Sequence, residues 1–355
     1  MRIGLVILTY NGHLFTKKLA ESIDGQERLP DDIVWVDNGS QDGTETFLES
    51  RAAKGDKIVL LGKNMGCAAG YNVGARECLD VDVICFLNQD LELDSHYLKS
   101  MMRAFAGADV LAVQPLVWRH GRSGLVENCG HTVDRLLTTV PILHDEAFDR
   151  HSVPVGMMFT LTAPAMRRDV FCLLGGFDEE LFIYYEDTDL SLRIWRLGDG
   201  RIVFAPDAQV FHHQEASSMA MLSSEKSYLW ARNRLRLLIK HASSTVGMLR
   251  VCVAMTGLLL ASFVLTLQGE SAGAALRKGI WWNLRNWTSN VQAWRVVNST
   301  AQLTLEQLAR QGIVQPSRLE WSGLVSRARL LFRRDPRLWR HVPRTEVTAA
   351  RGDER

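Results

Sequence analysis

The chain has 355 residues, of which 46% are hydrophobic and 23% charged, so it can bury one large core and a smaller one. Its six scattered cysteines include no CxxC pair, which argues against a zinc cage or a disulfide framework and favours a reducing compartment. The net charge is only +1, but residues 321–355 hold nine Arg and four acidic residues, 9 − 4 = +5, which leaves −4 for residues 1–320. Such a basic tail favours contact with an anionic surface, either a membrane or a nucleic acid.

Four short apolar runs, residues 3–8, 33–36, 58–61 and 83–87, open the chain. Each run is continuous, as expected for parallel strands that are covered on both faces. Helix-compatible stretches at 14–23, 44–51 and 68–79 separate them, which predicts an α/β fold with a mostly parallel, doubly wound sheet. The first run is too short for the core of a signal peptide, so we expect this region to stay in the cytoplasm.

Polar side chains follow each of these runs. They are Thr9, Tyr10 and Asn11 after the first run, Asp37, Asn38 and Ser40 after the second, Asn64 after the third, and Asn88 and Asp90 after the fourth. One such cluster is explained by ordinary turn chemistry. Four in succession, at the sheet edge where α/β proteins bind ligands, predict a nucleotide site.

The third loop, NMGCAAGYNVG, places Gly66, Gly70 and Gly74 at a spacing of four residues. This is neither GxGxxG nor GxxxxGK[ST], so a dinucleotide or Walker-type phosphate site is not supported. The spacing leaves one helix face without side chains. That face permits close approach of either a strand or a ligand, and the sequence leaves both open.

Three acidic residues, Glu186, Asp187 and Asp189, cluster just before a helical pattern in LFIYYEDTDLSLRIWRLG. Acidic groups at a helix N-terminus are stabilised by its dipole, which would explain one or two of them. Three within four residues repel one another, which favours one as a tuned general base. We expect Tyr184, Tyr185, Glu186 and Asp189 on the acceptor side, where the two tyrosines would form an aromatic wall suited to stacking on a sugar ring.

A metal shell is predicted from two distant positions. Asp90, at a strand end, is placed to hold Mg²⁺ or Mn²⁺ against a diphosphate. The segment VFHHQEASS supplies His212 and His213, which point to opposite faces of a strand, so at most one faces the site. A neutral imidazole there would complete the shell begun by Asp90.

An apolar stretch at 251–267 follows the last of these motifs. As a helix its 17 residues span about 26 Å, short of a bilayer core of roughly 30 Å. A single span would also place the Arg-rich tail across the membrane from a cytoplasmic domain, against the usual preference of basic flanks. We therefore expect helices lying in or on the membrane face, with Trp281, Trp282, Trp287 and Trp294 at the interface. A soluble helical subdomain that packs its Trp residues inward is the alternative.

Together these motifs resemble the inverting glycosyltransferases of family 2, most closely their bacterial rhamnosyltransferase-like members of surface-polysaccharide synthesis. TYNG, VDNGSQDGT, NMGCAAGYNVG, FLNQD, GGFDEELFIYYEDTDLSLR, FHH and YLWARNRLRLL occur in that family's order within residues 1 to about 240. The resemblance implies an A-type glycosyltransferase fold over 1–240, with a nucleotide-binding half at 1–95 and an acceptor half at 96–240. We assign 241–320 to a helical, membrane-associating region and 321–355 to the Arg-rich tail.

The resemblance also implies roles for individual residues. Asp187 would be the catalytic base, Asp37 would contact the nucleoside base, and Asp90 with His212 would hold a divalent cation, Mg or Mn. The other donor-side positions are Thr9, Tyr10, Asn11, Asn38, Asn64, Gly66 and Asn88. Asn88 replaces the first Asp of the family's DxD motif, which predicts weaker metal binding.

dTDP-rhamnose is the first donor expected, with UDP-hexoses behind it, and the expected acceptor is a lipid-linked saccharide.

Three other classes of protein fit the sequence less well. A methyltransferase would need a Gly-rich first turn, where TYNGH has only Gly12, and a sugar nucleotidyltransferase would need a Gly-rich, basic N-terminal loop. A non-catalytic membrane scaffold leaves EDTD and FHH without a role. Arg with Trp also suits nucleic acid, but a polysaccharide enzyme favours the cytoplasmic face of the membrane, and no nucleic acid partner is expected.

Overall fold

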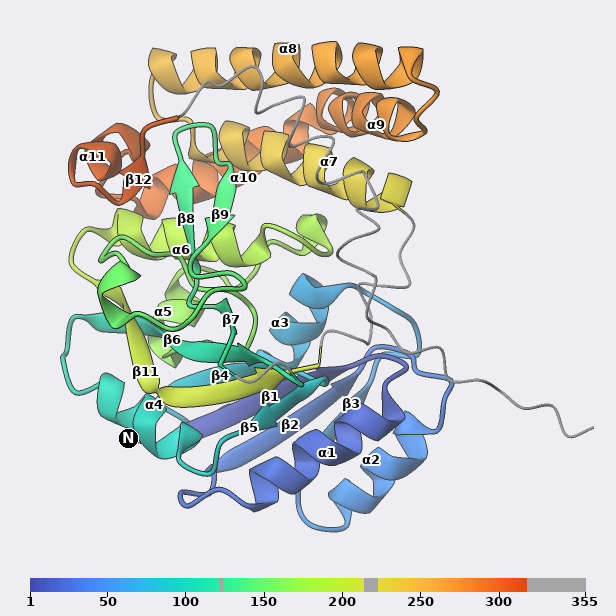
Figure 1. Cartoon of the computed structure of the whole chain (residues 1–355), viewed down its shortest axis with the longest axis vertical. Helices are drawn as coiled ribbons and strands as arrows, with labels where there is room; N and C mark the ends of the chain where they lie inside the picture. The colour runs from blue at the N-terminus through green and yellow to red at the C-terminus, as the bar shows by residue number, and fades with distance from the viewer. Residues whose placement is uncertain (122–123, 214–222, 318–355) are drawn as a thin grey trace, which may run out of the picture. The chain divides into compact units, whose positions relative to one another are not determined.

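The first part of the chain alternates strands and helices, as its apolar runs predict. The computed structural model describes residues 1–121, 124–213 and 223–317. Its first elements are β1 (Ile3–Thr9), α1 (His13–Asp24), β2 (Asp32–Asp37), α2 (Thr44–Ala52), β3 (Lys57–Leu60), α3 (Cys67–Glu77) and β4 (Val83–Asn88) (Figure 1). β1 pairs in parallel with both β2 and β4, and β2 pairs in parallel with β3. Every residue of β1 is buried, which explains its unbroken apolar run.

The main sheet continues beyond β4 with strands from later in the chain. These are β5 (Leu91–Leu93), β6 (Val110–Arg119), β7 (Val126–Asn128), β10 (Ala165–Arg167) and β11 (Arg201–His212). The strand order is β3-β2-β1-β4-β10-β6-β11-β5, with β7 paired to β6. β10 runs antiparallel to β4 and β6, while β6 and β11 are parallel. The sheet is therefore mixed but mostly parallel, which confirms the predicted fold class.

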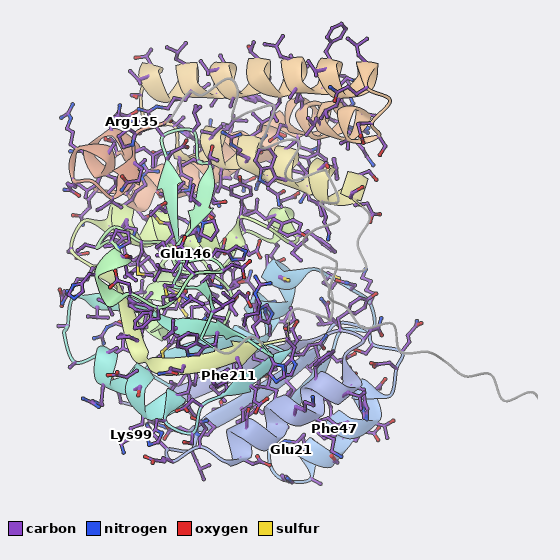
Figure 2. All side chains as sticks on the ribbon, in the orientation of Figure 1. Glu21, Phe47, Lys99, Arg135, Glu146 and Phe211 are labelled. Carbon is purple, nitrogen blue, oxygen red and sulfur yellow. The ribbon has the colours of Figure 1, made fainter. Side chains whose placement is uncertain are left out.

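Helices cover both faces of this sheet (Figure 1). On one face, α1 buries Leu19 and Ile23 in the core and leaves Glu21 exposed (Figure 2). On the other face α3 packs through its glycines, because a Cβ on Gly70 would collide with Leu8 and one on Gly74 with Val6. At these two positions the four-residue glycine spacing serves a strand rather than a ligand.

Short elements separate β5 from the C-terminal helices. They are α4 (Tyr97–Ala104), β8 (His131–Asp134), β9 (Thr139–Pro141), the 3-10 turns η1 (Arg150–Ser152) and η2 (Glu179–Leu181), α5 (Arg168–Leu173) and α6 (Glu186–Leu197). β8 and β9 form a second sheet with β12 (Val314–Gln315), which comes after the C-terminal helices. α6 begins at the acidic cluster, as the helical pattern predicts.

Within the described residues, five helices follow β11: α7 (Ser223–His241), α8 (Thr245–Leu267), α9 (Ala272–Arg285), α10 (Trp287–Thr300) and α11 (Leu305–Arg310). α7 is buried along most of its length and packs against α8, α9 and α10. All described residues belong to one compact unit, so the helices after residue 240 are built onto the catalytic body through α7. The Arg-rich tail, 321–355, lies outside the described residues.

α8 is longer than the apolar stretch that predicts it. It has 23 residues, is long and apolar enough by length and composition to cross a membrane, and only 28% of its most apolar window is buried. Among its exposed side chains are Leu260, Phe263 and Leu267. Trp281 and Trp287 are exposed as well, so the alternative in which these Trp residues pack inward is wrong for both.

Candidate active site

The turn after β2 is organised by the carboxylate of Asp37. It accepts hydrogen bonds from Thr9 Oγ1 at 3.0 Å and, within the turn, from Gly39 N at 3.0 Å and Ser40 N at 2.8 Å. The Ser40 hydroxyl adds a fourth at 2.5 Å. Asp37 is only 2% exposed and Thr9 is fully buried, so both residues shape the turn. Contact of Asp37 with a nucleoside base stays a prediction.

The polar residues of the second and third turns meet. The Asn38 side chain donates to Asn64 Oδ1 at 3.1 Å and accepts from the backbone N of Met65 at 2.7 Å. Asn64 Oδ1 also accepts from Gly66 N at 2.9 Å. Because two asparagines link these turns, the structure brings Asn38, Asn64 and Gly66 together as the donor-site prediction requires.

The first turn is held by a residue that the sequence analysis missed. Gln89 accepts from Tyr10 N and donates to Tyr10 O, both at 2.8 Å. Beside it, Asn88 Oδ1 accepts a hydrogen bond from the Tyr71 hydroxyl at 2.6 Å. Asn11 stands on the same turn with φ 47° and accepts from Gln41 N at 2.8 Å. The position of Gln89 at a strand end, between Asn88 and Asp90, is the sequence feature that could have identified it as a site residue.

Asp90 and His212, predicted as metal ligands, are neighbours. The Nε2 atom of His212 lies 3.2 Å from Asp90 Oδ1, and its Nδ1 atom lies 2.6 Å from Oε1 of Glu127 on β7. Burial alone would lower the pKa of His212, but its hydrogen bonds to Asp90 and Glu127 outweigh this and raise the pKa to about 10. Glu127 is 6% exposed, and no hydrogen bond to its Oε2 is found within the described residues. Sequence reasoning missed Glu127, since nothing local marks it.

His213 turns away from His212 and joins a different group. Its Nε2 atom lies 3.7 Å from Glu92 Oε2, and the His120 Nε2 atom lies 3.8 Å from the same oxygen. The rings of His120 and His213 stack with centroids 3.7 Å apart. The prediction that only one histidine of the pair faces Asp90 is confirmed.

Glu186 and Asp187 occupy the first turn of α6. Glu186 is 5% exposed, and burial, followed by the charge of Asp187, raises its pKa to about 8. Asp187 is half-buried and its Oδ1 accepts from Thr188 N at 2.6 Å. Thr188 in turn lies 2.9 Å from Nε2 of His131, a further residue that the sequence analysis missed.

Asp189 does not belong to the acceptor side, and that prediction is wrong. Its carboxylate is fully buried and is surrounded by Arg193 at 2.7 Å, Lys240 at 2.9 Å and His241 at 3.0 Å. Burial alone would raise the pKa of Asp189, but the charges of Arg193 and Lys240 and the hydrogen bond with His241 outweigh it and hold the pKa well below its usual range. The three partners come from α6 and α7, so Asp189 joins these helices.

The two tyrosines before α6 also differ. Tyr184 is half-buried, and burial raises its pKa to about 12. Tyr185 is 6% exposed and lies beside Trp230, with ring centroids 6.4 Å apart. The structure places Tyr185 in the interior instead of on the acceptor side, and the acceptor-side role of Tyr184 stays a prediction.

The two groups of carboxylates converge on the start of α3. Burial raises the pKa of the Cys67 thiol, and the charges of Glu186, Asp187 and Asp90 raise it further. Asp90, in the turn after β4, and the first residues of α6 lie about a hundred positions apart in the sequence. Helix α3 contacts both regions, because the backbone N of Cys67 donates to Phe182 O at 2.6 Å and the Tyr71 hydroxyl donates to Asn88 at the end of β4.

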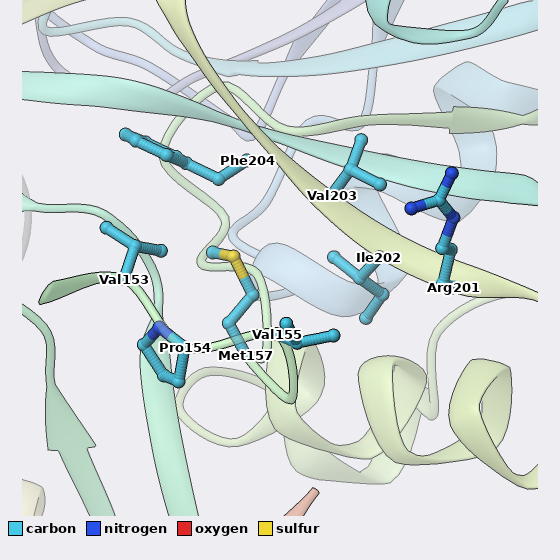
Figure 3. A pocket seen from close by; sticks show the side chains of 8 residues that line it. All are labelled: Val153, Pro154, Val155, Met157, Arg201, Ile202, Val203 and Phe204. Atoms are coloured by element: carbon cyan, nitrogen blue, oxygen red, sulfur yellow. The ribbon is translucent and has the colours of Figure 1, made fainter. Parts of the chain in front are cut away.

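An apolar hollow of about 220 Å³ lies elsewhere, against β11 (Figure 3). It is lined by Val153, Pro154, Val155, Met157, Arg201, Ile202, Val203 and Phe204. None of the predicted site residues lines it, so it is separate from the polar site.

Comparisons with known proteins show the family of the chain. The family model described as "Glycosyl transferase family 2" matches residues 5–171. An N-acetylglucosaminyl-diphospho-decaprenol L-rhamnosyltransferase of Mycobacterium tuberculosis (strain H37Rv) is 43% identical over 61% of this chain and 77% of its own length. The chain belongs to glycosyl transferase family 2. It is therefore an enzyme, which decides against the methyltransferase, nucleotidyltransferase and scaffold alternatives.

Other relatives and solved structures extend the comparison. The dTDP-rhamnosyl transferase RfbF of Shigella flexneri is 26% identical to this chain, over 67% of this chain and 80% of RfbF. The structure of GalNAc-T7 with UDP, GalNAc and Mn²⁺ has a TM-score of 0.51 at 14% identity and covers 69% of this chain and 52% of GalNAc-T7. S. aureus TarS with UDP-GlcNAc has a TM-score of 0.50 at 17% identity, over 88% of this chain and 92% of TarS. These likenesses show the A-type glycosyltransferase fold.

Proposed function

We propose that this glycosyltransferase moves L-rhamnose from dTDP-rhamnose to a hydroxyl of a lipid-linked saccharide in cell-surface polysaccharide synthesis. The proposal is supported by the rhamnosyltransferase names of its relatives, one of them 43% identical. The observation that carries the chemistry is that helix α3 contacts both Asn88, two residues before Asp90, and the loop that leads to Asp187. A UDP-hexose is the second donor considered, because TarS, which shares the fold, is solved with UDP-GlcNAc.

The donor would lie over the linked turns after β1, β2 and β3. Asn38, Asn64 and Gly66 offer side-chain and backbone polar groups there, and Tyr10 and Asn11 stand on the neighbouring turn. Asn88, held by the Tyr71 hydroxyl, would face the sugar or diphosphate. Asp37 keeps its turn in shape whether or not it contacts the base.

The residues present suit a divalent cation, Mg or Mn. Asp90 supplies a carboxylate and His212 an imidazole, and their ligand atoms lie 3.2 Å apart, as two ligands of one ion can. Glu127 would hold the other ring nitrogen of His212, which is the usual support of a metal-bound histidine. When bound, such an ion neutralises charge on a leaving diphosphate. GalNAc-T7, which shares the fold, is solved with Mn²⁺.

Asp187 is the residue we propose as the catalytic base. It would take the proton of the acceptor hydroxyl while that oxygen attacks the anomeric carbon from the face opposite the diphosphate. The new carbon–oxygen bond forms as the bond to the diphosphate breaks, so the product is inverted and no sugar–enzyme bond is needed. Asp187 is half-buried, open to an acceptor, and its neighbour His131 lies within electrostatic reach.

We further propose that the helical layer rests on the anionic cytoplasmic face of the membrane, where a lipid-linked acceptor is found. The exposed apolar side chains of α8 and the exposed Trp281 and Trp287 support this. Replacing Leu260 and Phe263 together by Asp should lower co-sedimentation with vesicles of anionic phospholipid at least tenfold. Unchanged co-sedimentation would place membrane contact elsewhere on the chain.

The donor and acceptor are tested directly. The purified protein is incubated with Mn²⁺, a polyprenyl-diphosphate N-acetylglucosamine and radiolabelled dTDP-rhamnose or, in parallel, UDP-hexoses. Transfer of label to the lipid from dTDP-rhamnose alone supports the proposal. Transfer only from a UDP-hexose would replace the donor, and no transfer from any donor would remove the proposed acceptor.

A further inference from the structure

The loop that leads into α6 has an unusual backbone. Phe182, Tyr184 and Tyr185 have φ values of 64°, 73° and 74°, in a region that side-chain-bearing residues rarely adopt. No glycine lies between Leu181 and Glu186 to ease this. Strained backbone persists only where surrounding contacts over-determine it. Asp187 follows the last of these residues, Tyr185, by two positions.

Asn233, in the middle of α7, supplies the principal contact. Its fully buried side-chain amide donates to the carbonyl oxygens of Leu181 at 2.9 Å, Ile183 at 2.8 Å and Tyr184 at 2.8 Å. Two N–H groups are thus shared among three acceptors. The neighbouring Arg232 adds bonds to the carbonyl of Glu180 at 2.8 Å and to that of Leu181 at 2.7 Å.

The other side of the loop is held by the start of α3. The backbone N of Cys67 donates to Phe182 O at 2.6 Å. A Cβ on Gly66 would lie 2.5 Å from that same oxygen, so only glycine permits this approach. The loop is therefore held between α7 and the turn that is predicted to bind the donor.

Helix α7 also binds side chains on both sides of Asp187 in the sequence. Arg236 and Lys240 bind Asp178, before the loop, with distances of 3.0 and 2.8 Å. Lys240 also binds Asp189, after Asp187, at 2.9 Å. Positions 233, 236 and 240 follow the spacing that places residues on one helix face. One face of α7 thus fixes the segment from Asp178 to Asp189.

We propose that Asn233 is a positioning residue for the transfer reaction. By holding three loop carbonyls it keeps the strained backbone that presents Asp187 to the acceptor, so α7 is part of the catalytic unit as well as the base of the helical layer. This proposal rests on the assignment of Asp187 as the base.

The test compares two buried asparagines. Asn233→Asp removes the N–H donors and sets a carboxylate against three carbonyls, and Asn233→Ser keeps a single donor. Asn283→Ala is the matched control, since Asn283 is 3% exposed, and its amide donates to the carbonyls of Arg232 and Gly279 and accepts from the Asn290 side chain at 3.2 Å. Hydrogen exchange of the peptide spanning 181–187 is measured by mass spectrometry, together with kcat and the Kd of the donor.

We expect exchange of the loop peptide to speed up at least tenfold in Asn233→Asp and less in Asn233→Ser, with the control like wild type. We expect kcat to fall 10- to 100-fold while donor Kd changes less than twofold. A loop peptide exchanging as in wild type in both Asn233 variants, or as fast in Asn283→Ala, would overturn the proposal. Faster exchange with wild-type kcat would overturn it as well. A wild-type enzyme inactive on every donor would count against the proposed function alone, because the exchange measurement needs no substrate.

Discussion

The turn after β2 and the loop before α6 each place an aspartate at the site, but they are held in opposite ways. In the turn, Asp37 binds residues two and three positions away, and the positive φ angles fall on Gly39 and Gly43. In the loop, the positive φ angles fall on Phe182, Tyr184 and Tyr185, and the bonds come from Asn233, about fifty residues on.

This difference separates a locally encoded half of the site from one that depends on distant support. A turn with glycines where φ is positive reaches its shape at little cost. Aromatic residues in the same region store strain, and other contacts must offset it. The turn after β2 should therefore keep its shape when distant packing is perturbed, whereas the loop before α6 should not.

Replacing the base should give the largest effect. Asp187→Asn keeps the size of the side chain but cannot accept a proton, so we expect kcat to fall by roughly two to four powers of ten. Donor binding, measured by calorimetry, should stay within twofold because the donor turns are separate. Asp109→Asn, at an exposed aspartate paired with Arg201, is the control and should keep full activity. Near-full activity in Asp187→Asn would remove the assignment.

The pH dependence of the unfolding free energy tests whether Glu186, beside the proposed base, is protonated in the folded protein. Its pKa is raised from 4.5 to about 8 in the folded protein, so the folded state binds an extra proton between these values. Stability should therefore fall as pH rises from 4.5 to 8. Glu186→Gln removes this loss, and relative to wild type it should gain roughly 3–5 kcal/mol between pH 5 and pH 9.

Urea unfolding at both pH values measures this gain. Glu21→Gln, at an exposed glutamate on α1, is the control and should show almost no change between the two pH values. If the unfolding free energies of Glu186→Gln and wild type depended equally on pH, Glu186 would be ionised in the folded protein.

The sequence predicts the locally encoded half well. Continuous apolar runs locate β1 to β4, and the polar residues that follow them do meet in the linked turns. The acidic cluster before a helical pattern locates the start of α6, and the adjacent histidines diverge as strand geometry requires. These signals are short-range, because each depends on residues within one element or one turn.

The remaining site residues act across long separations. Glu127 lies 85 positions from His212, and Lys240 lies 51 from Asp189. No periodicity or spacing within one element marks such partners, and Asp189 looked like a site carboxylate until its cations were visible. Asn233 stands in a motif that the family resemblance includes, yet nothing in its helical setting indicates three loop carbonyls.

The glycines of α3 give the smallest effect and test the local half. Gly74→Ala places a Cβ against Val6 and Val36, and moving α3 from the sheet should cost about 1–3 kcal/mol of unfolding free energy. Gly257→Ala is the matched control, since Gly257 lies in α8 with no atom near its added Cβ, and alanine there should stabilise by up to about 1 kcal/mol. Urea unfolding measures both. If Gly74→Ala were as stable as wild type but bound donor more weakly, the bare face of α3 would serve the ligand and not the sheet. The donor side would then depend on tertiary contacts as much as the base side does.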